Sequence, residues 1–173
     1  MAVTATGDLV AAHDEVVAVI QAIPDVTLDW QPGGEDWSLK QIIGHLAHAN
    51  DFYVMIVDQA RASNFGIVRL HRELAGWQRM ADTDAQVAQC ATVLAAHDCF
   101  ERTYQRMLAV LQSSTPEELD QPLVFYSWRQ DAEPENTTLR QRVIQRAAEH
   151  IREHQAQLTD TLARWQATQG VSP

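Results

Sequence analysis

The chain has 173 residues, 46% of them hydrophobic, which suits one domain with a sizeable core and leaves no apolar run long enough to cross a membrane. The formal net charge is −10, from 13 basic and 23 acidic residues, and the basic residues form no continuous stripe. This balance argues against nucleic-acid binding through phosphate neutralisation and against attachment to an anionic membrane. We therefore expect a single domain over residues 1–173 that acts on a small molecule.

The first two elements expected are long helices with readable ends. Apolar residues spaced three and four apart predict a helix over residues 6–23, which must end before Pro24. A second helix is expected over residues 38–61. Its start is Ser38-Leu39-Lys40-Gln41, a capping box in which the serine hydroxyl and the glutamine amide each satisfy a free backbone N–H.

The same kind of start predicts two further helices. Thr83 and Gln86 precede an apolar stripe that indicates a helix over residues 84–112. Thr138 and Gln141 precede another that indicates a helix over residues 139–166. Four helices of this length predict an all-α fold, a four-helix bundle with a long crossover between helices 2 and 3.

The two longest connections are expected to contain short elements of their own. The crossover of residues 62–82 is too long for a tight turn, and a short helix is expected near residues 69–75. Between helices 3 and 4, the sequence Ser114-Thr115-Pro116-Glu117-Glu118 is typical of a short helix start, and residues 123–128 are expected to be extended.

The N-terminal segment and the cysteines bear on the compartment of the protein. Acidic residues interrupt the first apolar run, so we expect no signal peptide. Cys90 and Cys99 lie nine residues apart on the expected third helix, which would place them on opposite faces and prevent a bond between them. A reduced, cytoplasmic protein is therefore expected.

The most informative feature is a histidine pair in the fourth expected helix. His150 and His154 are four residues apart, so they lie on the same helix face, as the two histidines of the helical HExxH zinc motif do. Both lie at the edge of the apolar stripe, between Ala147 and Leu158, and should point inward. A buried imidazole needs a partner, and a metal ion is one that satisfies it.

A third histidine, His45, occupies a similar place in the second expected helix, in line with Ile42 and Ala49. If the fold brings it to the pair, His45, His150 and His154 form a three-histidine metal site with an open coordination position. His48 is its competitor. It lies on a more polar row of the same helix, and we interpret it as a surface residue or as a residue that supports a ligand.

The remaining histidines have simpler interpretations. His13 and His97 fall on apolar stripes, and each is expected to be a hydrogen-bonded histidine at the core or its rim, with a pocket role as the alternative. His71 falls in the irregular crossover and is expected at the surface.

Sharper catalytic motifs fail on inspection. The string from His150 to His154 reads H-x-x-E-H, as in inverzincin peptidases, but no glutamate follows Glu153 to complete such a site. No histidine has a glutamate three residues before it, which a di-iron carboxylate bundle requires. The chain also has no G-x-S-x-G sequence.

Taken together, Trp37-Ser38 at the start of the second helix, His45-Leu46, and the pattern His150-x-x-x-His154-x-x-Gln157 resemble the DinB family. This family includes the YfiT-like metal-dependent hydrolases and thiol S-transferases. The resemblance covers nearly the whole chain in helix order and loop length. It implies a four-helix bundle in which His45, His150 and His154 hold one divalent metal ion, with nickel or zinc most typical.

The resemblance also implies activities and partners. Some family members transfer a low-molecular-weight thiol to electrophilic substrates, and many are homodimers. Apolar residues beside the main stripes would be available for such a dimer: Val10, Val17, Val87 and Leu94. Either a water or a thiol on the metal would become a nucleophile, so both a hydrolase and a thiol S-transferase stay open. The alternative is a non-catalytic, metal-stabilised helical bundle that acts as a binding or dimerisation module.

The walls of the expected site come from the loops. Four aromatic residues are candidates for such walls, although plain packing in the core or a loop is the simpler interpretation of each: Trp30, Trp77, Tyr126 and Trp128.

Overall fold

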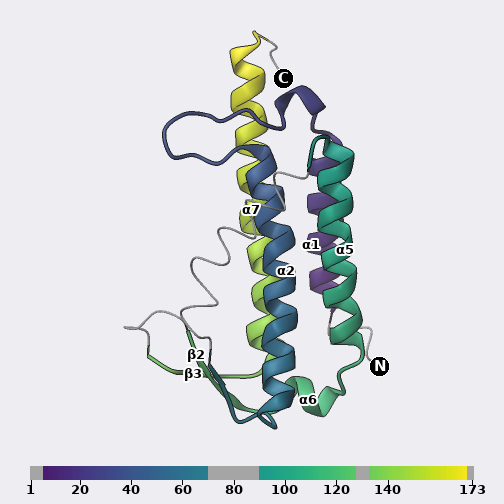
Figure 1. The fold of residues 1–173 in the computed structure, drawn as a ribbon, viewed down its shortest axis with the longest axis vertical. Helices are drawn as coiled ribbons and strands as arrows, with labels where there is room; N and C mark the ends of the chain where they lie inside the picture. Colours follow the sequence, from purple (N-terminus) through teal and green to yellow (C-terminus); the bar gives the residue numbers. More distant parts are fainter. Residues whose placement is uncertain (1–5, 70–89, 128–132, 171–173) are drawn as a thin grey trace.

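Long helices make up most of the computed structural model, which describes residues 6–69, 90–127 and 133–170 (Figure 1). The expectation of a mainly helical chain is confirmed. The helices are α1 Gly7–Gln21, η2 Asp25–Thr27, α2 Leu39–Ala62, α5 Val93–Gln112, α6 Pro116–Asp120, the π-helical segment η3 Arg140–Gln145, and α7 Arg146–Thr168. In these ranges no helix is both long and apolar enough to span a membrane.

The starts of α2 and α6 follow from their local sequence. Ser38 Oγ accepts a hydrogen bond from the Gln41 backbone N–H at 3.2 Å, and the Ser38 N–H donates to Gln41 Oε1 at 2.8 Å. Thr115 and Glu118 form the same reciprocal pair at the start of α6. Both predicted starts are confirmed, because a capping box acts only on residues three apart in the chain.

Helix α5 begins later than the sequence indicates. The prediction of a helix from residue 84 is wrong at its N-terminal end, because residues 90–92 are not helical and α5 starts at Val93. Thr92 Oγ1 accepts from the Ala95 N–H at 3.1 Å, and the Asp25 carboxylate accepts from the Val93 N–H at 2.8 Å. These two hydrogen bonds satisfy free backbone N–H groups in the first turn of α5. The Thr83 box lies outside the described residues.

A small three-stranded sheet was not predicted, so the all-α expectation is wrong in this respect. Strands β1 Ile67–Arg69 and β2 Leu123–Tyr126 pair in parallel, and β3 Glu135–Thr137 pairs antiparallel to β2. The expected extended run is β2. A short helix was expected near residues 69–75. Arg69 is instead the last residue of β1, and residues 70–75 lie outside the described part of the chain. Strands of three or four residues are too short to show a clear alternation in sequence.

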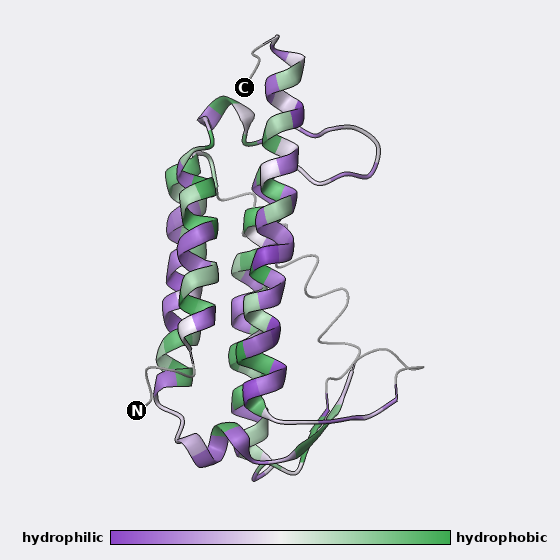
Figure 2. Ribbon diagram, turned by 180° about the vertical axis from the view of Figure 1, so that it is seen from behind, coloured by the Kyte–Doolittle hydropathy of each residue, from purple (hydrophilic) through white to green (hydrophobic). Residues whose placement is uncertain are grey.

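The four long helices pack in a closed ring of contacts. Helix α2 packs against α5 and α7, and α1 packs against the same two helices. Figure 2 shows polar and apolar residues sharing each of these helices, as expected when one face is buried and the other solvated. The largest fully buried side chains come mainly from these four elements and include Leu9, Ile20, Ile42, Leu46, Phe100 and Tyr104.

Two local features change the interpretation of the sequence. The fourth long helix opens with the π-helical turn of η3, and the Thr138 hydroxyl accepts from the Gln141 N–H at 3.2 Å just before it. Cys90 precedes α5 and does not lie on it, so the prediction that Cys90 and Cys99 face apart on one helix is wrong. Neither cysteine forms a disulfide bond within the described residues. Burial, and a hydrogen bond with Cys99, raise the pKa of the Cys90 thiol.

We predict that Ser38→Ala lowers the free energy of unfolding by about 1 kcal/mol, because the Gln41 N–H at the start of α2 loses its acceptor. Urea unfolding followed by circular dichroism measures the change. Ser63→Ala is the control, since the Ser63 hydroxyl donates to the Ala60 carbonyl at the other end of the same helix. Equal losses for the two variants would contradict a specific role for the cap.

Candidate metal centre

Helices α2 and α7 bring three histidines together in the space between them. His45 comes from α2, and His150 and His154 come from successive turns of α7. Each histidine lies at the edge of a buried apolar stripe. Leu46, next to His45, and Ile151, next to His150, are almost fully buried. The packing of the two helices therefore sets where the rings stand, and each ring is half-buried.

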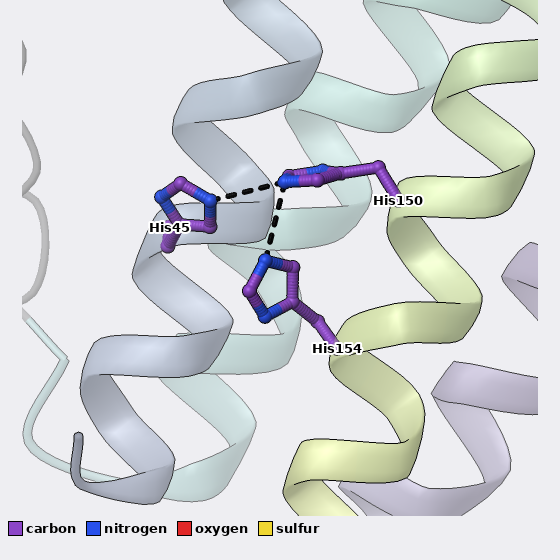
Figure 3. Close-up of side chains that lie close together, drawn as sticks. All are labelled: His45, His150 and His154. Carbon is purple, nitrogen blue, oxygen red and sulfur yellow. Dashed lines mark hydrogen bonds between the residues drawn. The ribbon is translucent and has the colours of Figure 1, made fainter. Parts of the chain in front are cut away.

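The rings meet through the same nitrogen atom of each side chain. His150 Nε2 lies 3.1 Å from His45 Nε2 and 3.1 Å from His154 Nε2 (Figure 3). The ligand atoms of all three lie within 4.8 Å of one another. One N–H can donate to only one of two neighbouring nitrogens, so hydrogen bonding among the rings cannot satisfy all three. A cation placed between them can accept all three lone pairs.

The other ring nitrogens bear on which atoms are free to bind a cation. His154 Nδ1 lies 2.8 Å from Gln157 Oε1, and since the amide oxygen only accepts, Nδ1 carries the hydrogen. This hydrogen bond leaves a lone pair on His154 Nε2, the atom that faces the other two rings. His150 Nδ1 is buried and has no hydrogen-bond partner among the described residues.

Burial keeps the two α7 histidines uncharged. Loss of solvent, with smaller contributions from His154 and Arg146, lowers the pKa of His150 to about 4. Burial also lowers the pKa of His154, partly offset by its hydrogen bond to Gln157. Neutral imidazole is the form that binds metal ions, so both rings are ready to act as ligands near pH 7.

The geometry and the donor set fit a transition-metal ion. Ligand nitrogens about 2.0–2.1 Å from a tetrahedral zinc ion stand roughly 3.3 Å apart. The distances from His150 Nε2 to the other two Nε2 atoms, 3.1 Å each, are close to this value, and the third pair of ligand atoms lies within 4.8 Å. Imidazole suits zinc and nickel among the common divalent ions. Within the described residues, no carboxylate or thiol joins the three histidines as a fourth candidate ligand. The three could therefore bind a metal ion and leave a coordination position open.

Glu153, the acidic residue of the H-x-x-E-H string, is engaged elsewhere. Its two carboxylate oxygens accept hydrogen bonds from Arg146 at 2.8 and 3.2 Å. This pairing lowers the pKa of Glu153, and the side chain is exposed. The arrangement is not that of a peptidase in which the inner glutamate activates a metal-bound water.

An aromatic residue beside the histidines was not among the predicted walls. The ring of Trp37 lies edge-on to His45 with centroids 4.9 Å apart, and parallel to His154 with centroids 6.1 Å apart. Trp37 precedes the helix, so no helical periodicity could have linked it to His45. Its signals in the sequence were its position directly before the Ser38 cap and its place, as Trp37-Ser38, among the residues that carry the family resemblance.

The predicted wall residues are not placed at the centre by any described contact. Trp30 is half-buried in the loop before α2, and Tyr126 lies under the Arg69 guanidinium in the sheet, with 4.4 Å from Arg69 Cζ to its ring centroid. In Figure 1 the strands lie near the C-terminal end of α2. His45 belongs to the N-terminal part of this helix, which runs from Leu39 to Ala62. Trp77 and Trp128 lie outside the described residues.

The other histidines do not join the group. His48 is half-buried on α2 and outside the three-histidine cluster. His13 is a hydrogen-bonded core histidine, as expected, with Nε2 2.8 Å from Glu101 and Nδ1 3.1 Å from Asp14. His97 is half-buried, and His71 lies outside the described part of the chain.

Comparison with known proteins identifies the family. The family model of the DinB superfamily matches residues 8–158, which include all three histidines of the cluster and Gln157. The chain belongs to the DinB superfamily, and the resemblance drawn from its sequence is confirmed. No curated protein and no solved structure matches the chain.

We predict that Gln157→Ala lowers zinc affinity by about 10- to 100-fold, because His154 loses the acceptor that fixes its tautomer and ring orientation. Competition with a chromophoric chelator measures the affinity. Gln155→Ala is the matched control, since no described hydrogen bond joins the Gln155 side chain to a histidine. Equal zinc affinity in both variants would show that the Gln157 contact does not support the ligand.

Proposed function

We propose that this member of the DinB superfamily folds as a four-helix bundle, binds one divalent metal ion, nickel or zinc, through His45, His150 and His154, and transfers a low-molecular-weight thiol to a small electrophilic substrate. The main observation behind the proposal is that the Nε2 atoms of the three histidines lie together, and hydrogen bonds among these rings cannot satisfy all three. Membership of the family supports it.

In this reaction the protein's own side chains would hold the metal ion, and their hydrogen bonds orient the imidazole rings. Neutral His150 and His154 present lone pairs toward His45, and Gln157 fixes the direction of one of them. A divalent ion bound there would lower the pKa of a coordinated thiol or water and so supply a nucleophile near neutral pH. An open position is what a catalytic site needs, whereas structural zinc sites usually close with four protein ligands.

Thiol transfer is favoured over hydrolysis because no carboxylate of the described residues joins the three histidines as a base. Among the described residues, Glu149 and Glu153 are the acidic residues directly before His150 and His154 in the sequence, and Arg146 donates hydrogen bonds to both carboxylates. A coordinated thiol is deprotonated outright, whereas the pKa of coordinated water falls only to near neutrality, so a base matters more to hydrolysis. In the proposed step the thiol proton passes to solvent, the sulfur forms a bond to the electrophilic carbon, and the leaving group departs with the bonding electrons.

The test is to load untagged protein with nickel and add a small thiol. We expect about one metal ion per chain by elemental analysis, a sulfur-to-nickel charge-transfer band on adding 2-mercaptoethanol, and consumption of an alkylating electrophile that depends on the metal. His45→Ala should abolish all three, because one of three ligands is lost.

His48→Ala is the matched control on the same helix, and it should keep the metal and the band. Equal loss in both variants would show that the wrong histidine of α2 was assigned. Metal binding without a thiol band or turnover would instead favour the non-catalytic, metal-stabilised module.

We further propose that two copies associate as a homodimer. Leu94 at the start of α5 and Val10 on α1 are 69% and 37% exposed, which leaves apolar surface for a partner, while Val17 is half-buried and Val87 lies outside the described residues. Light scattering should give the mass of a dimer at micromolar concentration, and Leu94→Glu should lower it. A monomeric mass for the unsubstituted protein would contradict the proposal.

A further inference from the structure

Trp37 is a large aromatic side chain that stays partly in solvent beside the histidine cluster. Its exposed fraction is 38%. The indole nevertheless contacts the cluster on two sides, edge-on to His45 and parallel to His154. Tryptophan is highly buried on average, and Trp37 keeps more than a third of its surface in solvent while it contacts the two histidines. The exposed part of this ring therefore remains available to a molecule bound at the cluster.

The chain holds Trp37 in place through both of its neighbours. Ser38 is fixed by the capping box with Gln41, with bonds of 2.8 and 3.2 Å. On the other side, Asp36 accepts a hydrogen bond from Arg164 of α7 at 3.1 Å. The loop before α2 is thereby attached both to α2, which carries His45, and to α7, which carries His154 (Figure 1). The position of the indole is set by the same two helices that set the histidines.

We propose that Trp37 is a specificity-determining wall of the substrate site, and that it stacks on a flat, uncharged apolar group carried by the molecule that binds or reacts at the metal. This inference rests on the proposed metal-dependent function. Aromatic rings stack favourably on indole beyond the burial of area alone.

The charge of the metal ion disfavours charged groups at the Trp37 wall. Three neutral imidazoles would leave a divalent ion with its full positive charge, which repels a cationic group close by. An anionic group would be drawn to the ion itself and not to the indole. The ring therefore discriminates best among uncharged groups, and an aromatic or other flat apolar group gains most from it.

The test compares two thiols on the nickel-loaded protein without oxygen. Phenylmethanethiol carries a flat ring one carbon from sulfur, and 2-mercaptoethanol carries a small polar group. The charge-transfer band gives the Kd of each, and the ratio of the two constants measures the preference. We expect the ratio in the unsubstituted protein to exceed that in Trp37→Ala by about three- to tenfold in favour of the aromatic thiol.

Trp30→Ala is the matched control, because Trp30 belongs to the same loop and makes no described ring contact with the histidines; its ratio should equal that of the unsubstituted protein. Trp37→Phe should keep part of the preference. Should Trp37→Ala fail to fold, Trp37→Leu, which keeps apolar volume without a ring, replaces it.

The outcomes separate the two proposals. Nickel binding with the same thiol ratio in all variants overturns the role of Trp37 and leaves the metal function standing. Loss of nickel in Trp37→Ala with an unchanged ratio in Trp37→Leu overturns it too, because the side chain would then only support the ligands. Failure of every protein to bind nickel overturns the proposed function itself, and the wall with it.

Discussion

A buried imidazole must have a partner for its nitrogen atoms, and this requirement governs the space between α2 and α7. The contrast with His13 makes the point. The protein supplies that ring with a carboxylate at each nitrogen, Asp14 and Glu101, and a stacked ring, Tyr104, with centroids 3.7 Å apart. At the cluster the protein supplies three nitrogens that face one another and one amide, from Gln157. His13 thus has a protein partner at each ring nitrogen, whereas the three Nε2 atoms of the cluster could be bound together by a cation.

The distribution of charge around the cluster adds to this difference. Each arginine of η3 and α7 pairs with an acidic residue: Arg140 with Asp120, Arg142 with Glu135, Arg146 with Glu153, Arg152 with Asp8, and Arg164 with Asp36. These pairs hold their carboxylates at the surface of the helices, and no carboxylate of the described residues joins the three histidines. The centre is lined by neutral rings, so a bound ion would keep an uncompensated charge with which to activate a ligand.

The parts of the fold that could be predicted from sequence are those decided by residues close together in the chain. The Ser38 and Thr115 caps act over three residues, and the His150–His154 pair over four. The missed features depend on distant residues. Helix α5 starts where it does partly because Asp25, 68 positions earlier, accepts from Val93. The sheet requires β1 and β2, which are far apart in sequence, to pair. Trp37 reaches His154 only through the tertiary fold.

The direction in which the histidines of α7 point depends on the number of residues in and after the π-helical turn of residues 140–145. A π turn accommodates one residue more than an α turn, so residues on one side of the helix are five apart across it and not four. Removing one residue inside this turn would restore a regular helix and leave His150 directed toward α2. Removing one residue between this turn and His150 would instead rotate the ring by about 100° around the helix axis. The π-helical turn therefore tolerates the loss of one residue, whereas residues 146–149, between the turn and His150, do not.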